Sequence, residues 1–305
     1  MDHIHAELVT KITLHALKKN IILDPDHLPG ALELIQIVNR KYPSLKQIAC
    51  YDTAFHQNLP PVARKFALPR NLEKEGIKRY GFHGLSYGYL IEKLKRERGI
   101  KQAKGRLILM HLGSGASMTA VSNLKSIDTT MGFTPTGGLM MGTRCGDLDP
   151  GIILYLLQKN GLTAKDLNKL LNKESGLLGV SGKTADMQML LSLKETDAHA
   201  AEAIALFCYQ VKKNLCAYIG ILGGIDAIVF TGGIGENIPE IRTQICEGLG
   251  FLGVKLDQKK NEHSESLISI RGQIPIYVIK TDEEHMIALM TIELLTNQSS
   301  TEPNS

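Results

Sequence analysis

The sequence has few of the features that mark secreted, thiolate-metal or membrane proteins. Its five cysteines, an odd number, form no CxxC pair and no other metal-ligand spacing. Neither a closed disulfide framework nor a thiolate metal site is therefore indicated. No apolar run is long enough to span a membrane, and residues 1–20 are polar and amphipathic rather than a leader. These absences favour a protein of the reducing cytoplasm.

An excess of charge of one sign is also missing. The chain has 35 Lys and Arg against 31 Asp and Glu, a formal net charge of +4. Its one dense basic run, residues 93–98, contains Glu97 and is typical of a solvated helix face rather than a phosphate-binding patch. We expect no nucleic-acid partner.

The 305 residues, 43% hydrophobic and 22% charged, predict a folded protein with one large or two ordinary domains. Strand-like apolar runs occupy residues 47–52, 106–112, 226–231 and 274–279, and residues 119–126 indicate a hairpin. Helical spacing occurs at residues 31–41, 153–159, 201–221 and 283–296. Thr163 before Asp166, and Asp282 before Glu283, are typical helix starts. The pattern predicts an α/β fold with a mixed sheet and a frayed tail at residues 298–305.

Two of the strands run into glycine-rich turns. Residues 110–117 pass from an apolar strand into Gly113-Ser114-Gly115, where consecutive backbone N–H groups can bind phosphate oxygens. The alternative there is a tight hairpin turn without a ligand. Residues 227–237 form a second strand and glycine loop before Pro239, which suits a first helical turn. This second loop is neither a P-loop nor a dinucleotide fingerprint, so its meaning depends on the first.

Three polar side chains stand out near such turns. Arg144 is the basic residue of a long glycine-rich segment, residues 131–150, and could clamp charged oxygens. The alternative is a structural ion pair with Asp147 or Asp149. Asp52 ends the first strand, a common active-site position, although it could instead cap the following turn. His83 lies among glycines and could equally be a structural histidine.

These segments resemble the acetate kinase family, part of the actin-like and sugar-kinase-like phosphotransferases. The resemblance rests on motifs that occur in the family's order at residues 52–56, 79–84, 111–117, 131–135, 138–149, 175–179, 233–237 and 281–284. It implies a two-lobed actin-like ATPase or ribonuclease H-like α/β fold. Residues 1–55 would be the remainder of an N-terminal lobe, with a C-terminal helix at 284–297 packing back on it. Residues 56–283 would be the nucleotide-binding lobe.

The resemblance also implies roles. Asp52 would be the active-site carboxylate, and His83 and Arg144 would stabilise charge on the transferring phosphoryl group. Glu283 would bind Mg²⁺, with Mn²⁺ as a possible substitute; otherwise Glu283 and Glu284 are favourable acids in a first helical turn. The implied substrates are ATP or ADP and acetate or acetyl phosphate, and the implied assembly is a homodimer. The implied nucleotide contacts are His111, Leu112, Gly113, Ser114, Gly115, Asp186, Met187, Gln188, Gly233, Ile234, Gly235, Glu236 and Asn237.

The sequence departs from the family pattern in three places. Ser114 replaces a usual Asn and Gln188 a usual Arg, so we expect weaker ATP binding. The chain also begins downstream of the family's first phosphate loop and substrate-binding Arg, which predicts an incomplete N-terminal lobe and exposed strand edges. The expected function is acetate kinase. The alternatives are a propionate or butyrate kinase, or a catalytically impaired remnant that still binds nucleotide.

Overall fold

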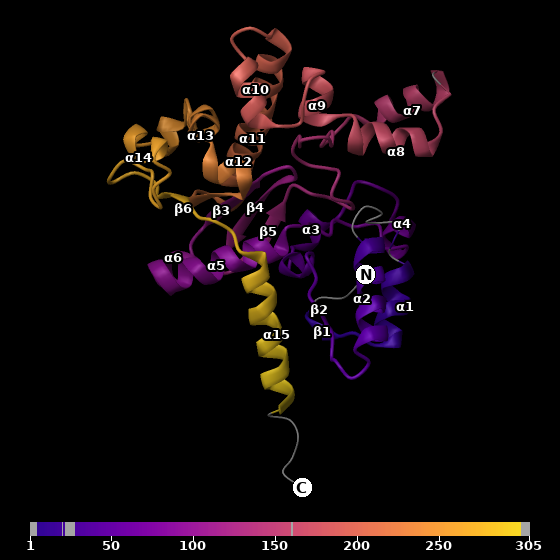
Figure 1. Ribbon diagram of the computed structural model, residues 1–305. Helices are drawn as coiled ribbons and strands as arrows, with labels where there is room; N and C mark the ends of the chain where they lie inside the picture. The colour runs from indigo at the N-terminus through magenta and orange to yellow at the C-terminus, as the bar shows by residue number, and fades with distance from the viewer. Residues whose placement is uncertain (1–4, 20, 22–27, 160, 300–305) are drawn as a thin grey trace.

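The computed structural model describes residues 5–19, 21, 28–159 and 161–299 (Figure 1). Its centre is a five-stranded sheet in the order β5-β4-β3-β6-β7. The strands β3, β4 and β5 are antiparallel, whereas β3, β6 and β7 are parallel. The predicted mixed sheet and the hairpin are therefore confirmed. The strands are β3 (Leu107–Leu112), β4 (Ala116–Ser122), β5 (Lys125–Thr129), β6 (Ala227–Thr231) and β7 (Ile276–Val278).

Helices cover both faces of this sheet because its central strands are apolar on both faces. In β3, Ile108, Met110 and Leu112 belong to the larger core cluster, which includes side chains of α11 (Ala198–Leu222). The alternate residues Leu107 and Leu109 join the smaller cluster with α5 (Gly84–Arg98). Alternation along a strand sends neighbouring side chains to opposite faces, so an unbroken apolar run is what a sheet covered on both sides requires.

The N-terminal segments and the last helix lie on one side of the sheet (Figure 1). There β1 (Glu7–Leu8) pairs antiparallel with β2 (Ile48–Ala49), so the predicted strand at 47–52 is only two residues long. The long helix α15 (Glu283–Ser299) contacts α5, and its Ile287 carbonyl accepts a weak bond from Cys50. The division into lobes at residue 55 stays a prediction. Two further helices in this region are α1 (Lys11–Lys19) and α2 (Leu28–Lys41).

The predicted long helices and helix starts are confirmed. Thr163 and Asp166 form a capping box at α8, Asp282 accepts the His285 N–H at the start of α15, and Pro239 opens α13. Helix α15 reaches Ser299, inside the expected tail, and residues 300–305 lie outside the described residues. The remaining elements are η2 (Ala54–His56), α3 (Pro61–Arg64), α4 (Arg70–Lys74), α6 (Ile100–Ala103), α7 (Pro150–Lys159), α8 (Ala164–Lys173), α9 (Gly176–Ser181), α10 (Met187–Leu193), α12 (Gly232–Asn237), α13 (Pro239–Cys246), η3 (Leu249–Leu252) and α14 (Gln258–Glu262).

One interpretation of the sequence was wrong in form. Residues 232–237 are not an open glycine loop but the short helix α12, which begins directly at the end of β6. Within the described chain, no helix combines the length and the apolar character needed for a membrane span.

A buried histidine fixes the approach of η2 to the sheet. The Nδ1 atom of His56 lies 2.8 Å from Ser126 Oγ, and Nε2 lies 3.0 Å from the Phe82 carbonyl oxygen. Gly81 packs on this ring with φ +73°, and a β-carbon there would lie 2.6 Å from it, so only glycine fits. Burial lowers the pKa of His56 to about 4, against a smaller opposing effect of the Phe82 carbonyl.

This pKa predicts acid-sensitive stability. Below the pKa of an unfolded histidine, near 6.5, the unfolded chain binds a proton that buried His56 does not. The stability present above that pH should fall by on the order of 3 kcal/mol as the pH falls toward 4. We expect urea unfolding of His56→Gln to show a flatter pH dependence than the wild type in this window. His263→Gln, at an exposed histidine, should keep the wild-type slope; equal slopes for all three chains would contradict the assignment.

Candidate active site

A cavity of about 600 Å³ lies beside the β3–β4 turn, at the carboxyl end of β3. Open α/β sheets bind ligands at this end of their strands. The three predicted catalytic residues and the predicted metal ligand all line it, although they come from four separate parts of the chain. The lining residues are Leu17, Leu28, Ala31, Cys50, Tyr51, Asp52, Thr53, Phe82, His83, His111, Ser114, Gly115, Pro135, Arg144 and Glu283.

Asp52 is held by the first turn of α5. Its Oδ2 accepts the His83 N–H at 2.6 Å, its Oδ1 accepts the Leu85 N–H at 3.2 Å, and its carbonyl oxygen accepts the Gly84 N–H at 2.8 Å. A β-carbon on Gly84 would lie 2.1 Å from that carbonyl, so glycine is required for this approach. Asp52 therefore does act as a cap, but of a helix far along the chain, and the positive end of that helix favours its charge.

His83 precedes α5 in the left-handed region, with φ 57° and ψ 28°. Such a conformation is unusual for a residue other than glycine and persists only where surrounding contacts enforce it. Its Nδ1 lies 2.8 Å from Ser117 Oγ, and its ring stacks on His111 with centroids 4.2 Å apart. A β-carbon on Gly115 would lie 3.3 Å from His83 Nε2. The ring is thus bound structurally through one nitrogen and presents the other to the cavity.

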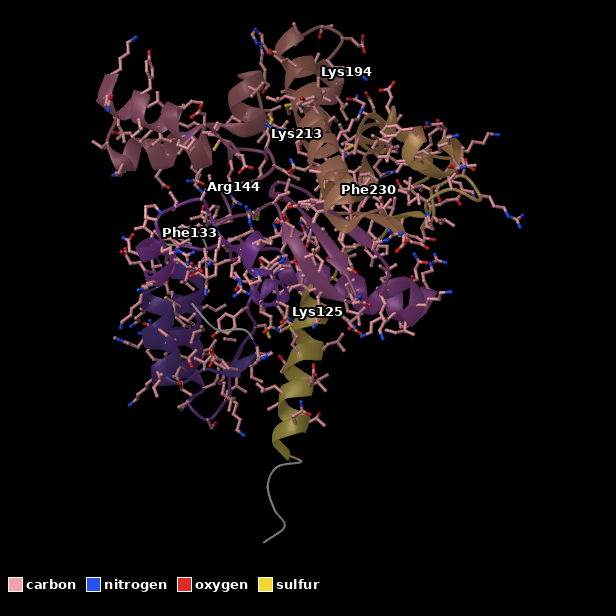
Figure 2. The ribbon with its side chains drawn as sticks, turned by 180° about the vertical axis from the view of Figure 1, so that it is seen from behind. Lys125, Phe133, Arg144, Lys194, Lys213 and Phe230 are labelled. Atoms are coloured by element: carbon pink, nitrogen blue, oxygen red, sulfur yellow. The ribbon has the colours of Figure 1, made fainter. Side chains whose placement is uncertain are left out.

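Arg144, from a different part of the chain, also approaches Gly115. Its Nη1 would lie 3.7 Å from a β-carbon on Gly115, and it bonds weakly to the Pro135 carbonyl at 3.4 Å. Figure 2 shows Arg144 below the α7–α8 pair, on the side facing the N-terminal helices. Asp147 and Asp149 accept backbone N–H groups of Gly138 and Gly151 instead. The alternative of an ion pair between Arg144 and either acid is wrong for this structure.

Glu283, the first residue of α15, is half-buried on the cavity wall, whereas Glu284 is exposed. Burial, and then the charge of Asp52, raise the pKa of Glu283 above its usual range. A divalent cation held by Glu283 would offset this repulsion. The described residues contain no group of three His, Cys, Asp or Glu side chains that could hold a metal. One or two carboxylates completed by phosphate and water is a Mg²⁺ arrangement, so the residues fit that ion.

The β3–β4 turn is a hairpin, as the ligand-free alternative assumed, and it also faces the cavity. The Gly113 N–H donates to the Gly115 carbonyl at 2.9 Å. The exposed Ser114 and the half-buried Gly115 line the cavity beside His111. Burial, and then His83, lower the pKa of His111 to about 3, so this imidazole is neutral at physiological pH. Leu112 is fully buried in the core and could reach a nucleotide only through its backbone.

The second predicted nucleotide segment lies beside the first but outside the cavity lining. A β-carbon on Gly113 would lie 3.6 Å from the Gly233 N, so α12 begins next to the hairpin turn. The Oε1 of Glu236 accepts the Thr231 hydroxyl and the Gly232 and Thr281 N–H groups, which makes this acid an internal cap. Ile234 and Gly235 are buried, whereas Gly233 and Asn237 are exposed and bonded to each other.

The third predicted nucleotide segment, at the start of α10, is farther from the chemistry. Asp186 caps α10 by accepting the Met189 N–H at 2.9 Å, Met187 is buried, and Gln188 is exposed. A β-carbon on Gly142 would lie 3.4 Å from Ala185 and 3.3 Å from the Ser114 carbonyl. The segment therefore starts beside the hairpin turn but does not line the cavity.

Four polar residues behind the histidines were missed by the sequence interpretation. Ser117 and Tyr87 bond to each other, Ser117 supports His83, and Ser86 supports His111 at 2.9 Å and Thr281 at 2.8 Å. Ser117 and Thr281 lie within the family motifs at 111–117 and 281–284, but a hydroxyl side chain carries no signal of its partner in sequence.

A mixed α/β sheet with charged side chains gathered around a cavity at its strand ends is an arrangement that suits a phosphotransferase. The protein-family model described as "Acetokinase family" matches residues 1–289 of the sequence. The chain therefore belongs to the acetokinase family.

Curated proteins that resemble this chain are named acetate kinases. The acetate kinase of Rhodopseudomonas palustris strain TIE-1 is 50% identical over 269 residues, covering 87% of this chain and 67% of the relative. The acetate kinase of Methylocella silvestris is 44% identical over 294 residues, covering 96% and 72%. The chain thus spans about two thirds to three quarters of the length of these relatives.

Solved structures share the fold. A propionate kinase from Francisella tularensis superposes with a TM-score of 0.89 at 41% identity, covering 94% of this chain and 74% of that one. The Porphyromonas gingivalis acetate kinase gives 0.90 at 37% identity, covering 96% and 75%. Both neighbours confirm the predicted fold class.

Proposed function

We propose that this protein transfers a phosphoryl group between ATP and acetate, giving acetyl phosphate and ADP. The observation that carries the proposal is the convergence of His83 Nε2 and Arg144 Nη1 on Gly115 in one cavity, with Asp52 and Glu283 on its walls. Phosphoryl transfer asks a protein chiefly for positioning and for donors around the transferring oxygens. The names of the curated relatives support the same reaction.

In this proposal Arg144 supplies fixed charge to the equatorial phosphoryl oxygens and His83 supplies a hydrogen-bond donor. The carboxylate of Asp52 is held by two backbone N–H groups and places a negative charge on the cavity that Arg144 and His83 also line. The turn at residues 113–115 and the adjacent start of α12 hold the nucleotide phosphates through backbone N–H groups. Glu283 would hold Mg²⁺, which when bound neutralises charge on the phosphates. Asp186, Met187 and Gln188, at the start of α10, would contact the nucleotide from outside the cavity lining.

The acyl specificity is a finer part of the proposal. Leu17, Leu28 and Pro135 give the cavity an apolar side, and the Francisella neighbour is named a propionate kinase. One methylene changes kcat/KM by roughly 10- to 200-fold in an apolar pocket. We expect kcat/KM to decrease from acetate to propionate to butyrate when the acyl phosphate is trapped as its hydroxamate. A higher kcat/KM for propionate or butyrate would make that carboxylate the substrate in place of acetate. Tight ATP binding without formation of an acyl phosphate would favour the catalytically impaired remnant.

The proposed metal ligand is tested by a charge-removing substitution with a neighbouring control. Glu283→Gln removes the half-buried carboxylate and should raise the Mg²⁺ concentration needed for half-maximal activity by about tenfold or more. Glu284→Gln changes the exposed adjacent acid and should leave the Mg²⁺ titration unchanged. Equal shifts in the two variants would show a general electrostatic effect at the start of α15 rather than a ligand.

We further propose a homodimer that forms through α7. This helix, Pro150–Lys159, has the sequence PGIILYLLQK but buries none of its residues. Figure 1 shows α7 and α8 projecting together from the body. The exposed fractions are 44% for Ile152, 58% for Leu154, 51% for Tyr155 and 39% for Leu157. An apolar helix face exposed in this way marks an association surface.

Light scattering after size exclusion tests the dimer. Leu154→Glu places a charge in the middle of this face and should convert the dimer to a monomer. Phe251→Glu changes a more exposed apolar residue on η3 and should leave the dimer intact. A wild-type chain that elutes as a monomer would contradict the proposal.

Unpaired thiols at all five cysteines support a reducing compartment, which we propose to be the cytoplasm.

A further inference from the structure

The two stacked imidazoles of the cavity are each held from behind by a buried serine. His83 Nδ1 lies 2.8 Å from Ser117 Oγ, and His111 Nδ1 lies 2.9 Å from Ser86 Oγ. Both serine side chains are fully buried. Each serine bonds a second hydroxyl as well, Tyr87 for Ser117 and Thr281 for Ser86. A hydroxyl has one hydrogen, so each chain of bonds has a direction.

That direction can be worked out for the hydrogen bonds that join Tyr87, Ser117 and His83. Tyr87 is fully buried, and burial raises the pKa of its phenol well above the usual value, so the phenol keeps its hydrogen. A buried O–H needs an acceptor. Among the side chains that the structure describes, Ser117 Oγ is the one bonded to this hydroxyl. Tyr87 therefore donates to Ser117, and the Ser117 hydrogen is directed to its other partner, His83 Nδ1. A nitrogen that accepts carries no hydrogen, so the ring hydrogen of neutral His83 lies on Nε2.

We propose that Tyr87 and Ser117 are positioning residues that fix His83 as the Nε2–H tautomer, aimed at the point where Arg144 also converges. The proposal rests on the proposed function, because it assigns the donor that His83 offers to the transferring phosphoryl group. The opposite tautomer would turn the Nε2 lone pair toward phosphoryl oxygens and repel them. The enforced left-handed backbone of His83 and the stacked His111 ring hold the ring plane, and the hydroxyl pair sets its hydrogen.

Nitrogen-15 NMR of histidine-labelled protein reads the tautomer directly and needs no substrate. The chain contains two internal references. His56 must carry its hydrogen on Nε2, because Nε2 lies 3.0 Å from a carbonyl oxygen that can only accept. His263 Nδ1 lies 2.7 Å from the Lys259 carbonyl, so Nδ1 carries the hydrogen there. At alkaline pH, where imidazoles are neutral, His83 should match the His56 pattern. A His83 spectrum that matches His263 overturns the proposal. Loss of the signal in His83→Gln assigns it.

Two variants test the consequence. Ser117→Ala and Tyr87→Phe remove one hydroxyl each, and both should mix the His83 tautomers and lower kcat by about tenfold or more, with KM for ATP and acetate nearly unchanged. Ser117→Thr keeps a hydroxyl and should restore the Nε2–H pattern and much of the kcat. Ser126→Ala is the matched control, since Ser126 supports His56 away from the cavity. It should alter the His56 signal and leave kcat unchanged.

The outcomes are separable from the proposed function. A loss of kcat with an unchanged His83 tautomer would show that Ser117 and Tyr87 act by packing, and would overturn the proposal. A wild-type chain without acyl phosphate formation contradicts the proposed function. In that chain, a His83 signal of the Nε2–H type that changes in Tyr87→Phe still supports the positioning device.

Discussion

Arg144→Ala should lower kcat for acyl phosphate formation by about a thousandfold or more, the usual effect of removing an arginine that stabilises a transferring phosphoryl group. The guanidinium contacts the Pro135 carbonyl at 3.4 Å and the Met141 sulfur at 3.8 Å. In the part of the chain that the structure describes, no carboxylate neutralises it. Its charge is therefore available to the phosphoryl oxygens, and KM for ATP should change much less than kcat.

The same geometry predicts little effect of Arg144→Ala on folding. Its few weak contacts are partly exposed, so the free energy of unfolding measured in urea should change by less than about 1 kcal/mol. Arg144→Lys keeps the charge without the planar fork and should recover only part of the rate. Arg271→Ala, at an exposed arginine, should leave both kcat and unfolding unchanged. If Arg144→Ala destabilised the chain and kept its kcat, the role of Arg144 would be structural.

The central sheet could be predicted because its strands are apolar on both faces and need no partner information to be recognised. The strand at 47–52 was overestimated because its length depends on β1, a two-residue partner in a polar segment. Helix α12 could not be predicted from its sequence GGIGEN, because glycine disfavours a helix interior. Side-chain bonds hold it: Glu236, within the helix, accepts the Gly232 N–H and the Thr281 N–H, and the Arg242 guanidinium of α13 donates to the Gly235 carbonyl.

The site residues were predicted through the family resemblance, because Asp52, His83, Arg144 and Glu283 each had a structural alternative when taken alone. The fold brings all four to one cavity. The sequence could not separate a functional arginine from a structural one. Arg79, in the same motif as His83, donates to backbone carbonyls of Ala63 and residues 129–131. Only the bonding geometry distinguishes it from Arg144.

Arg242→Met should lower the free energy of unfolding by about 3–5 kcal/mol, the effect of leaving buried polar groups without their charged partner. The Arg242 side chain is fully buried. Its Nε and Nη2 bond Asn261 Oδ1 and the Asn261 carbonyl, both at 2.7 Å, and Nη2 also bonds Ser264 Oγ at 2.9 Å. Its Nη1 donates to the carbonyls of Gly235 at 2.8 Å and Glu236 at 3.0 Å. Burial lowers its pKa to about 10, so it stays charged at neutral pH.

These bonds make Arg242 the C-terminal cap of α12, the helix whose start lies beside the β3–β4 turn. Its loss should therefore weaken nucleotide binding as well as stability, whereas Arg144→Ala affects the rate alone. Arg106→Met provides the contrast. Arg106 bonds Asp226 at 2.8 Å near the surface, and solvent screening should make the effect of its loss much smaller than that of Arg242→Met.

A double substitution separates the lost bonds from the lost volume. Asn261→Leu alone leaves the guanidinium partly unpaired and should be destabilising. In Arg242→Met with Asn261→Leu both sides of that contact are apolar, so the double variant should be more stable than the sum of the two single effects predicts. Strict additivity would show that Arg242 stabilises the chain through packing rather than through its bonds to Asn261. Urea unfolding at neutral pH measures all four chains of this cycle.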